Sequence, residues 1–200
     1  MTCKAKKAEA FRPVFDAIER LDRQGMTAVI AIDGRSGSGK SMLSGLIQNR
    51  IDCNVFHMDD FFLQPHQRTE ERLAEPGGNI DYERFMSEVI GNIKSGREFE
   101  YRVFDCSAGE LGGTVRVAPK RINIIEGVYS MHPLWYPILD LKVFLYVNEA
   151  VQQERILERS GEEKLKRFIG EWIPLEEKYF STFRIRENSD IVIDTSAVTG

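Results

Sequence analysis

One stretch of the sequence decides the fold: residues 28–41 read Ala-Val-Ile-Ala-Ile-Asp-Gly-Arg-Ser-Gly-Ser-Gly-Lys-Ser. Residues 28–32 are apolar, which is typical of a strand buried on both faces of a sheet. Residues 34–41 then follow the spacing G-x-x-x-x-G-K-S, that of a phosphate-binding loop between a strand and a helix. With a helix expected over about 40–50, this stretch predicts a nucleoside triphosphate site; a plain glycine-rich turn is the less specific alternative.

The chemistry of such a loop explains its residues. Backbone N–H groups can surround a phosphate only where no Cβ intrudes, so glycines at 34, 37 and 39 keep the loop open. The helix that follows directs its positive N-terminal end at the anion. Lys40 is expected on the β- and γ-phosphates and the Ser41 hydroxyl on Mg²⁺. The candidate ATP-binding residues are Gly34, Ser36, Gly37, Ser38, Gly39, Lys40, Ser41 and Met42.

Composition and charge narrow the class of protein. The 200 residues are 42% hydrophobic and 29% charged, with a formal net charge of −4. These values are typical of one globular domain, 1–200, and the absence of a long basic run disfavours a nucleic-acid partner. Three widely spaced cysteines predict reduced thiols, and we identify neither a signal peptide nor a membrane-spanning segment. We expect a cytoplasmic protein with a small-molecule substrate and no membrane partner; homo-oligomer formation stays open.

The rest of the chain alternates between helical and extended patterns. Apolar spacing predicts helices over 8–24, with Pro13 in the first turn, and over 81–94, 149–168 and 171–186, with an interruption at Gly161. Short apolar runs predict strands over 54–58, 121–126, 141–147 and 190–194. This alternation predicts an α/β fold with a parallel sheet and helices on both faces.

Two segments outside this pattern are candidates for handling a substrate. Residues 63–118 comprise a loop over 63–80 and, beyond a helix, two alternating runs, 98–104 and 114–118, which predict a small hairpin flap outside the main sheet. Residues 150–170, most of which belong to the helix predicted over 149–168, are rich in charge and include Arg155 and Arg159. Such a helix is either a solvated face or a mobile cationic lid over a transferring phosphoryl group, and spacing alone does not decide between them.

Carboxylates follow two of the predicted strands. Asp59 and Asp60 come after the strand at 54–58, and Glu126 ends the strand at 121–126. Ligands of open α/β sheets bind at the carboxyl ends of strands, so these side chains are candidates for holding Mg²⁺ and for taking a proton from an acceptor alcohol. Because neighbours in an extended chain point opposite ways, we expect one of the two aspartates to face the site. The candidate metal ligands are Ser41, Glu126 and Asp59.

An ordered set of motifs from Ala28 to Thr195 resembles the phosphoribulokinase/uridine kinase family of P-loop small-molecule kinases. The set comprises the phosphate loop, His57-Met-Asp-Asp-Phe-Phe62, Asn79-Ile-Asp-Tyr82, Ile124-Ile-Glu-Gly127, Arg155 with Arg159, and Asp190-Ile-Val-Ile-Asp194. The resemblance implies a P-loop NTPase fold with a five-stranded parallel core, a substrate flap and an arginine-bearing lid, and it implies ATP and Mg²⁺. It also implies catalytic roles for Asp59, Lys40, Arg155 and Arg159, and substrate contacts from Asp59, Phe61, Asp81, Tyr82, Phe104 and Asp105.

Some residues depart from the uridine kinase pattern. Phe104 stands where a tyrosine is usual, the flap lacks the histidine that typically follows, and the lid arginines are shifted by about one residue. These departures concern the acceptor and not the type of reaction. The expected activity is transfer of the γ-phosphoryl group of ATP to a primary alcohol, and a nucleoside is the first candidate acceptor. Nicotinamide riboside, pantothenate or a sugar phosphate are alternative acceptors. A nucleotide-dependent switch or ATPase is disfavoured because no Asp-x-x-Gly follows the metal strand and no Asn-Lys-x-Asp is present.

Overall fold

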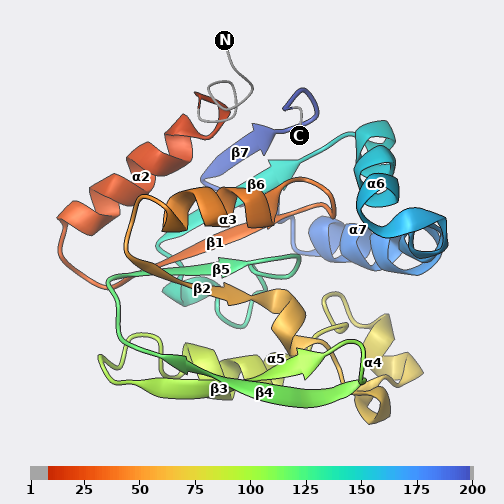
Figure 1. Cartoon of the computed structure of the whole chain (residues 1–200), viewed down its shortest axis with the longest axis horizontal. Coiled ribbons are helices and arrows are strands. Elements are labelled where there is room, and N and C mark those ends of the chain that lie inside the picture. The colour runs from red at the N-terminus through yellow and green to blue at the C-terminus, as the bar shows by residue number, and fades with distance from the viewer. Residues whose placement is uncertain (1–8, 199–200) are drawn as a thin grey trace.

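A computed structural model describes residues 9–198 of the chain, and its centre is a parallel sheet (Figure 1). Five strands lie in the order β2 (Cys53–His57), β5 (Ile122–Glu126), β1 (Ala28–Gly34), β6 (Leu141–Tyr146) and β7 (Ile191–Asp194). Every pair of neighbours is parallel. All seven residues of β1 are buried, as an apolar central strand requires. The predicted five-stranded parallel sheet is confirmed.

Helices cover both faces of this sheet. On one face, α2 (Arg12–Arg23) and α3 (Lys40–Gln48) bury Val14, Ile18, Leu43 and Ile47 against alternate residues of β1, β5 and β6. Pro13 lies in the first turn of α2, as expected. On the other face lie α7 (Ile173–Thr182) and the segment 128–139 with its 3-10 turn Tyr136–Ile138. The predicted start of the first helix at residue 8, and Cys3, fall outside the described residues.

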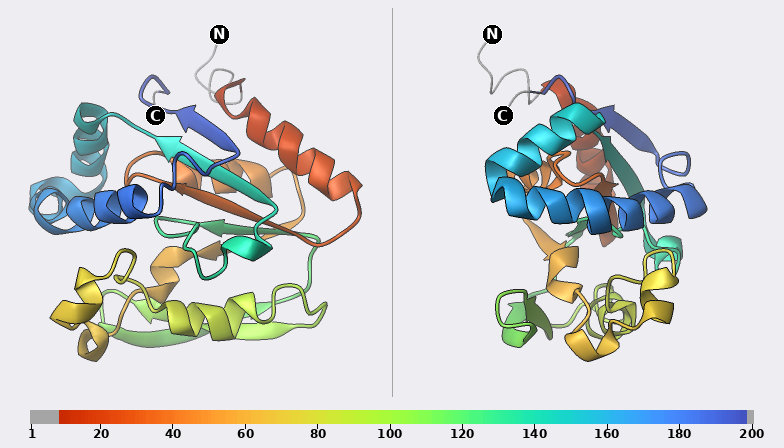
Figure 2. Two further views of the ribbon diagram at one scale, coloured as in Figure 1. Left: turned by 180° about the vertical axis from the view of Figure 1, so that it is seen from behind. Right: turned by 90° about the vertical axis from the view of Figure 1, so that its right-hand side faces the viewer.

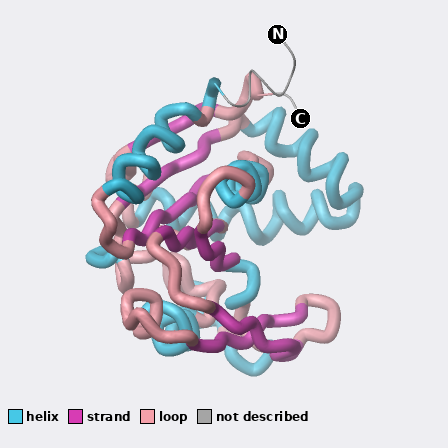
Figure 3. Tube along the Cα trace, turned by 60° about the vertical axis from the view of Figure 1, so that its left-hand side comes forward, coloured by secondary structure: helices cyan, strands magenta, loops and turns pink. Residues whose placement is uncertain are grey.

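The excursion between β2 and β5 forms the lower part of Figure 1. It contains 3-10 turns at Met58–Phe61 and Pro65–Gln67, α4 (Glu70–Ala74), and α5 (Tyr82–Phe85), which continues as a π-helical turn at Met86–Ile90. It ends in the antiparallel hairpin of β3 (Phe99–Asp105) and β4 (Glu110–Val117), which forms a separate sheet, visible apart from the main one in Figure 3. The hairpin flap is confirmed, whereas the structureless loop expected over 63–80 instead contains short helices.

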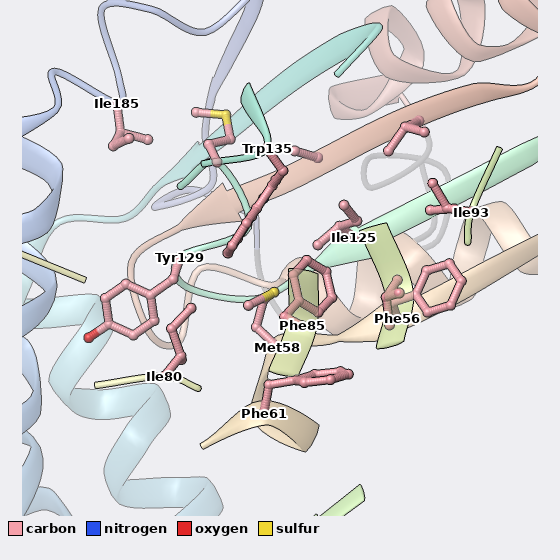
Figure 4. Close-up of a cluster of buried hydrophobic side chains, with 14 of the residues drawn as sticks. Phe56, Met58, Phe61, Ile80, Phe85, Ile93, Ile125, Tyr129, Trp135 and Ile185 are labelled. Carbon is pink, nitrogen blue, oxygen red and sulfur yellow. The ribbon is translucent and has the colours of Figure 1, made fainter. Parts of the chain in front are cut away.

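An aromatic cluster joins this excursion to the main sheet (Figure 4). The ring of Phe85 lies 4.8 Å from that of Phe61 and 4.7 Å from that of Trp135, both edge-on. Phe56 of β2 and Ile125 of β5 belong to the same buried cluster. Because edge-on aromatic pairs are specific in geometry, the cluster fixes where the flap sits relative to the carboxyl ends of β2 and β5.

The C-terminal helices stand beside the carboxyl ends of the strands (Figure 2). Helix α6 (Glu149–Arg167) is kinked at Gly161, whose backbone has φ 80° and ψ 172°, and it passes through a π-helical turn at Phe168–Trp172 into α7. The interruption at Gly161 is where the sequence predicts it. No helix among residues 9–198 combines the length and the apolar composition that crossing a bilayer requires.

Candidate active site

The phosphate loop joins β1 to α3, and two of its glycines are required by backbone geometry. Gly34 has φ 141°, and a Cβ there would lie 2.1 Å from the carbonyl oxygen of Leu145 on β6. Gly39, the residue before α3, has φ 92°, a left-handed conformation that side chains disfavour. The loop therefore passes close to the sheet and leads directly into α3, whose first amides have no acceptor within the helix.

Lys40 lies across this loop. Its side chain is buried, and Nζ donates hydrogen bonds to the carbonyl oxygens of Gly34 at 2.8 Å and Arg35 at 3.0 Å. The next residue, Ser41, donates from Oγ to Glu126 Oε1 at 3.1 Å. The first two residues of α3 thus supply a cationic side chain and a hydroxyl that contacts a carboxylate.

The Ser41–Glu126 pair fits a magnesium ion better than it fits a transition metal. Within residues 9–198, no group of three or more His, Cys, Asp or Glu side chains surrounds a common metal position. Mg²⁺ prefers oxygen donors and keeps several waters, so a hydroxyl and one carboxylate beside a phosphate suffice. Glu126 is only 5% exposed and also lies 2.8 Å from Nδ1 of His57, a hydrogen bond that raises the pKa of His57.

Asp59 and Asp60 lie on a 3-10 turn rather than on the extended chain that the sequence predicts, because β2 ends at His57. The turn separates their environments. Asp60 accepts a hydrogen bond from the Tyr101 hydroxyl of the flap at 3.2 Å. Asp59 has no hydrogen-bond partner in the described part of the chain. Its side chain is solvent-accessible yet closely surrounded by protein; this desolvation raises the pKa of Asp59, the Lys40 ammonium opposes the rise, and the Glu126 carboxylate adds to it.

Phe61 and Asp81, two of the predicted substrate contacts, are engaged by other residues of the protein. Phe61 is fully buried in the aromatic cluster, under the guanidinium of Arg84. Asp81 is 4% exposed; it caps α5 by accepting from the Arg84 amide at 3.0 Å and also accepts from Gln67 Nε2 at 3.0 Å. Arg84 in turn donates to the carbonyl oxygen of Asp60 at 2.8 Å. Both predicted residues therefore support the turn that carries the aspartates.

Three further predicted contacts lie on the excursion. The Tyr82 ring packs against the Arg72 guanidinium, 3.6 Å from its centre, and stacks with the His132 ring at 5.4 Å. Phe104 is half-buried and pairs with a β4 residue across the hairpin. Asp105 is exposed and accepts hydrogen bonds from the Ser107 hydroxyl and from the backbone N–H groups of residues 107 and 108. These hydrogen bonds order the turn of the flap and lower the pKa of Asp105.

The two lid arginines occupy different positions. Arg155 donates to the carbonyl oxygens of Gly37 at 3.0 Å, Thr195 at 2.8 Å and Val198 at 2.7 Å, so it ties α6 to the phosphate loop and to the end of the chain. Arg159 is exposed, with its guanidinium 5.8 Å from the centre of the Phe168 ring. The structure therefore does not bring the two arginines to one point.

Sequence reasoning missed two buried carboxyl groups that contact the phosphate loop. Asp33 is fully buried and accepts from the amides of Gly34 at 2.7 Å and Met131 at 3.0 Å; burial raises its pKa to about 6. Glu176 of α7 accepts from Ser36, 140 residues earlier in the chain. The position of Asp33 directly before Gly34 was a usable signal, whereas nothing local in the sequence marks Glu176.

Comparisons with known proteins agree with this geometry. No protein-family model matches the chain. Over 149 residues it is 24% identical to uridine kinase of Staphylococcus aureus, an alignment covering 69% of this chain and 70% of that protein. It is 28% identical over 123 residues to the inorganic pyrophosphatase TTM2 of Arabidopsis thaliana, and 25% over 126 residues to uridine-cytidine kinase C of Dictyostelium discoideum. These alignments cover 58% and 62% of this chain but span only 17% and 28% of those two longer proteins.

Solved structures share the whole fold. A possible uridine kinase from Bacillus stearothermophilus superposes with a TM-score of 0.64 at 23% identity, over 91% of this chain and all of that one. A candidate fructose transport system kinase from Silicibacter superposes with a TM-score of 0.66 at 23% identity, over 96% of this chain and 98% of the other. Together with the phosphate loop and its facing carboxylates, these relatives show a P-loop kinase fold and support a uridine kinase-like kinase family for the chain.

Proposed function

We propose that the chain is an ATP-dependent kinase that transfers the γ-phosphoryl group to a primary alcohol of a small metabolite. One observation carries the proposal: Asp59, a carboxylate without a hydrogen-bond partner among residues 9–198, stands near both Lys40 and Glu126 at the phosphate loop. A phosphate loop alone serves many nucleotide hydrolases. A carboxylate placed to accept a proton is what transfer to an alcohol adds.

In this proposal the loop amides and Lys40 hold the β- and γ-phosphates and offset their charge. Ser41 and Glu126 would hold Mg²⁺, which supplies further charge neutralisation when it is bound. Asp59 accepts the proton of the acceptor hydroxyl as its oxygen bonds to the γ-phosphorus. The bond between that phosphorus and the bridging oxygen breaks, and ADP leaves. The exposed Arg159 is the lid arginine available to approach the γ-phosphoryl group, while Arg155 supports the loop.

A nucleoside is the first candidate acceptor, because a relative aligned over 69% of the chain is named uridine kinase and a solved structure covering 91% of it is titled a possible uridine kinase. The departures at Phe104 and in the lid support keeping nicotinamide riboside, pantothenate and sugar phosphates as alternatives. A site that hydrogen-bonds particular substrate groups discriminates steeply, so a few altered residues change the acceptor without changing the reaction. The proposal includes no nucleic-acid or membrane partner and a cytoplasmic setting, in which Cys53 and Cys106 remain thiols.

The test is ADP release from ATP and Mg²⁺ in the presence of a panel of nucleosides, nicotinamide riboside, pantothenate and sugar phosphates. We expect one class of acceptor to raise the rate at least about a hundredfold over water, because a positioned hydroxyl replaces an unpositioned one. Mass spectrometry should find the phosphate on a primary hydroxyl. ADP release at the same rate with and without every acceptor would contradict the proposal and favour an ATPase or switch.

A further inference from the structure

A buried carboxylate from a distant helix binds the first half of the phosphate loop. Glu176 lies on α7 and is 4% exposed. Its carboxylate accepts two hydrogen bonds from one residue, the Ser36 amide at 3.1 Å and the Ser36 hydroxyl at 2.5 Å. A buried carboxylate is stable only when it is paired or hydrogen-bonded, and hydrogen bonds to an ionised acceptor are among the strongest in proteins. This contact is therefore a specific link between α7 and the loop.

Neighbouring residues of α7 reinforce the link. Glu177 accepts from Arg35 Nε at 2.6 Å, and the Tyr179 hydroxyl donates to Asp33 Oδ2 at 2.9 Å. Within four residues, one helix therefore contacts three positions between the end of β1 and the middle of the loop. The charge of Glu176 also attracts the Lys40 ammonium, which lies across the same loop.

Two roles are conceivable for an anion at this place: it could occupy the phosphate position, or it could brace the loop. The contacts favour a brace. Among residues 9–198, Glu176 accepts hydrogen bonds only from Ser36, and it accepts none from the amides of Gly37, Gly39 and the first turn of α3, where a phosphate is expected. Helix α7 is also anchored at Asp33 below the loop, which fixes the carboxylate rather than letting it swing into the centre.

We infer that Glu176 is a positioning residue that holds the backbone at Ser36 so that the following amides converge on the polyphosphate. The inference rests on the proposed function only in taking ATP as the ligand of the loop. Glu176 acts through Ser36 and touches neither substrate. Its loss should therefore weaken nucleotide binding and leave the affinity for the acceptor alcohol unchanged.

The test is calorimetric titration of ATP with Mg²⁺, without any acceptor, into wild type and variants. Glu176→Ala removes both hydrogen bonds, and we expect ATP binding at least about tenfold weaker. Glu176→Gln can still accept from the amide and can donate to the hydroxyl, so we expect affinity within about threefold of wild type. The control is Glu187→Gln, an exposed glutamate just beyond α7, which should bind ATP as wild type does.

Each other result has a defined meaning. Unchanged ATP affinity in Glu176→Ala would overturn the inference, and tighter binding would overturn it in favour of a carboxylate that competes with phosphate. If Glu176→Ala does not fold, Ser36→Ala keeps the amide bond and loses the hydroxyl bond, and several-fold weaker ATP binding is expected; wild-type affinity would again overturn the inference. A wild-type protein that binds no ATP would instead refute the proposed function itself, and with it the inference.

Discussion

Two parts of the molecule, named for their proposed roles, are stabilised in different ways. The phosphate-binding half is the main sheet with the loop after β1, and the acceptor half is the excursion between β2 and β5. β1 buries all seven of its residues, whereas β4 of the flap buries Val117 alone among eight. The loop after β1 is supported by buried groups, Asp33 and Glu176 among them. The part that we propose binds the polyphosphate is thus built into the core, whereas the part proposed to select the acceptor is attached to it.

Outside the buried aromatic cluster, ion pairs and stacked rings hold the acceptor half together. Arg72 pairs with Glu83 and covers the Tyr82 ring, and Arg68 reaches Glu171 beyond the lid helix at 3.0 Å. Exposed ion pairs contribute little individually and local stability follows buried contacts, so this half should open more easily than the sheet. Changes in the two halves should therefore have separable effects: on ATP in the first and on the acceptor in the second.

The largest expected effect is from Lys40→Ala in the phosphate-binding half. Removing the ammonium takes away the charge nearest the β- and γ-phosphates, so we expect weaker ATP binding and a loss of turnover of about a thousandfold. Calorimetry and ADP release measure the two effects. Lys94→Ala, which removes an exposed lysine paired with Asp140, is the control and should change neither. Wild-type ATP affinity in Lys40→Ala would count against the phosphate assignment.

Asp59→Asn should come next, at the boundary between the halves. The amide cannot accept the proton of the acceptor, so we expect turnover to fall at least about a hundredfold while ATP affinity is spared. Asp60→Asn is a matched control one residue away, because an amide oxygen can still accept from the Tyr101 hydroxyl. Equal turnover in the two variants would show that Asp59 is not the base.

A stability measurement tests whether the loop is supported by a buried acid. The pKa of Asp33 rises from its ordinary 3.8 to about 6 on folding. The folded state therefore binds the Asp33 proton more tightly than the unfolded state does. The contribution of this proton to the free energy of unfolding is complete below about pH 4 and is lost as the pH rises through 6. By linkage the loss is up to about 3 kcal/mol. Urea unfolding of wild type and Asp33→Asn should show the wild-type advantage shrinking over this range; a constant difference would contradict it.

The smallest effect is expected in the acceptor half, from Arg72→Lys. Lysine keeps the charge but loses the fork that binds Glu83 and the flat face over Tyr82. We expect the KM of the acceptor to rise several-fold, with ATP affinity unchanged. Arg116→Lys, on the exposed face of the flap, is the control. An effect on ATP rather than on the acceptor would remove the distinction between the halves.

The features that could be predicted from the sequence are those that neighbouring residues encode. The order of strands and helices, the flap and the break at Gly161 follow from local patterns, and each appears in the structure. The phosphate loop could be predicted because one contiguous motif encodes it. The turn at Asp59 was missed because a 3-10 turn has no apolar period, and strand-like alternation was the wrong geometry for it.

The support of the site could not be predicted, because it depends on contacts between distant segments. Glu176 meets Ser36 across 140 residues, and Arg84 binds the carbonyl oxygen of Asp60 across 24. Motif resemblance also named Phe61 and Asp81 as substrate contacts, although packing buries the first and capping of α5 engages the second. A residue type at the right spacing identifies the region of the site. Tertiary packing determines which side chains in that region remain free to contact a ligand.

The most direct test of the central claim is a crystal structure with a non-hydrolysable ATP analogue and Mg²⁺. The account predicts phosphate oxygens within hydrogen-bond distance of the amides between Gly37 and Ser41, the metal beside Ser41 and Glu126, and the Asp59 carboxylate facing the γ-phosphate. A polyphosphate bound elsewhere, or Asp59 and Glu126 turned away from it, would contradict the account.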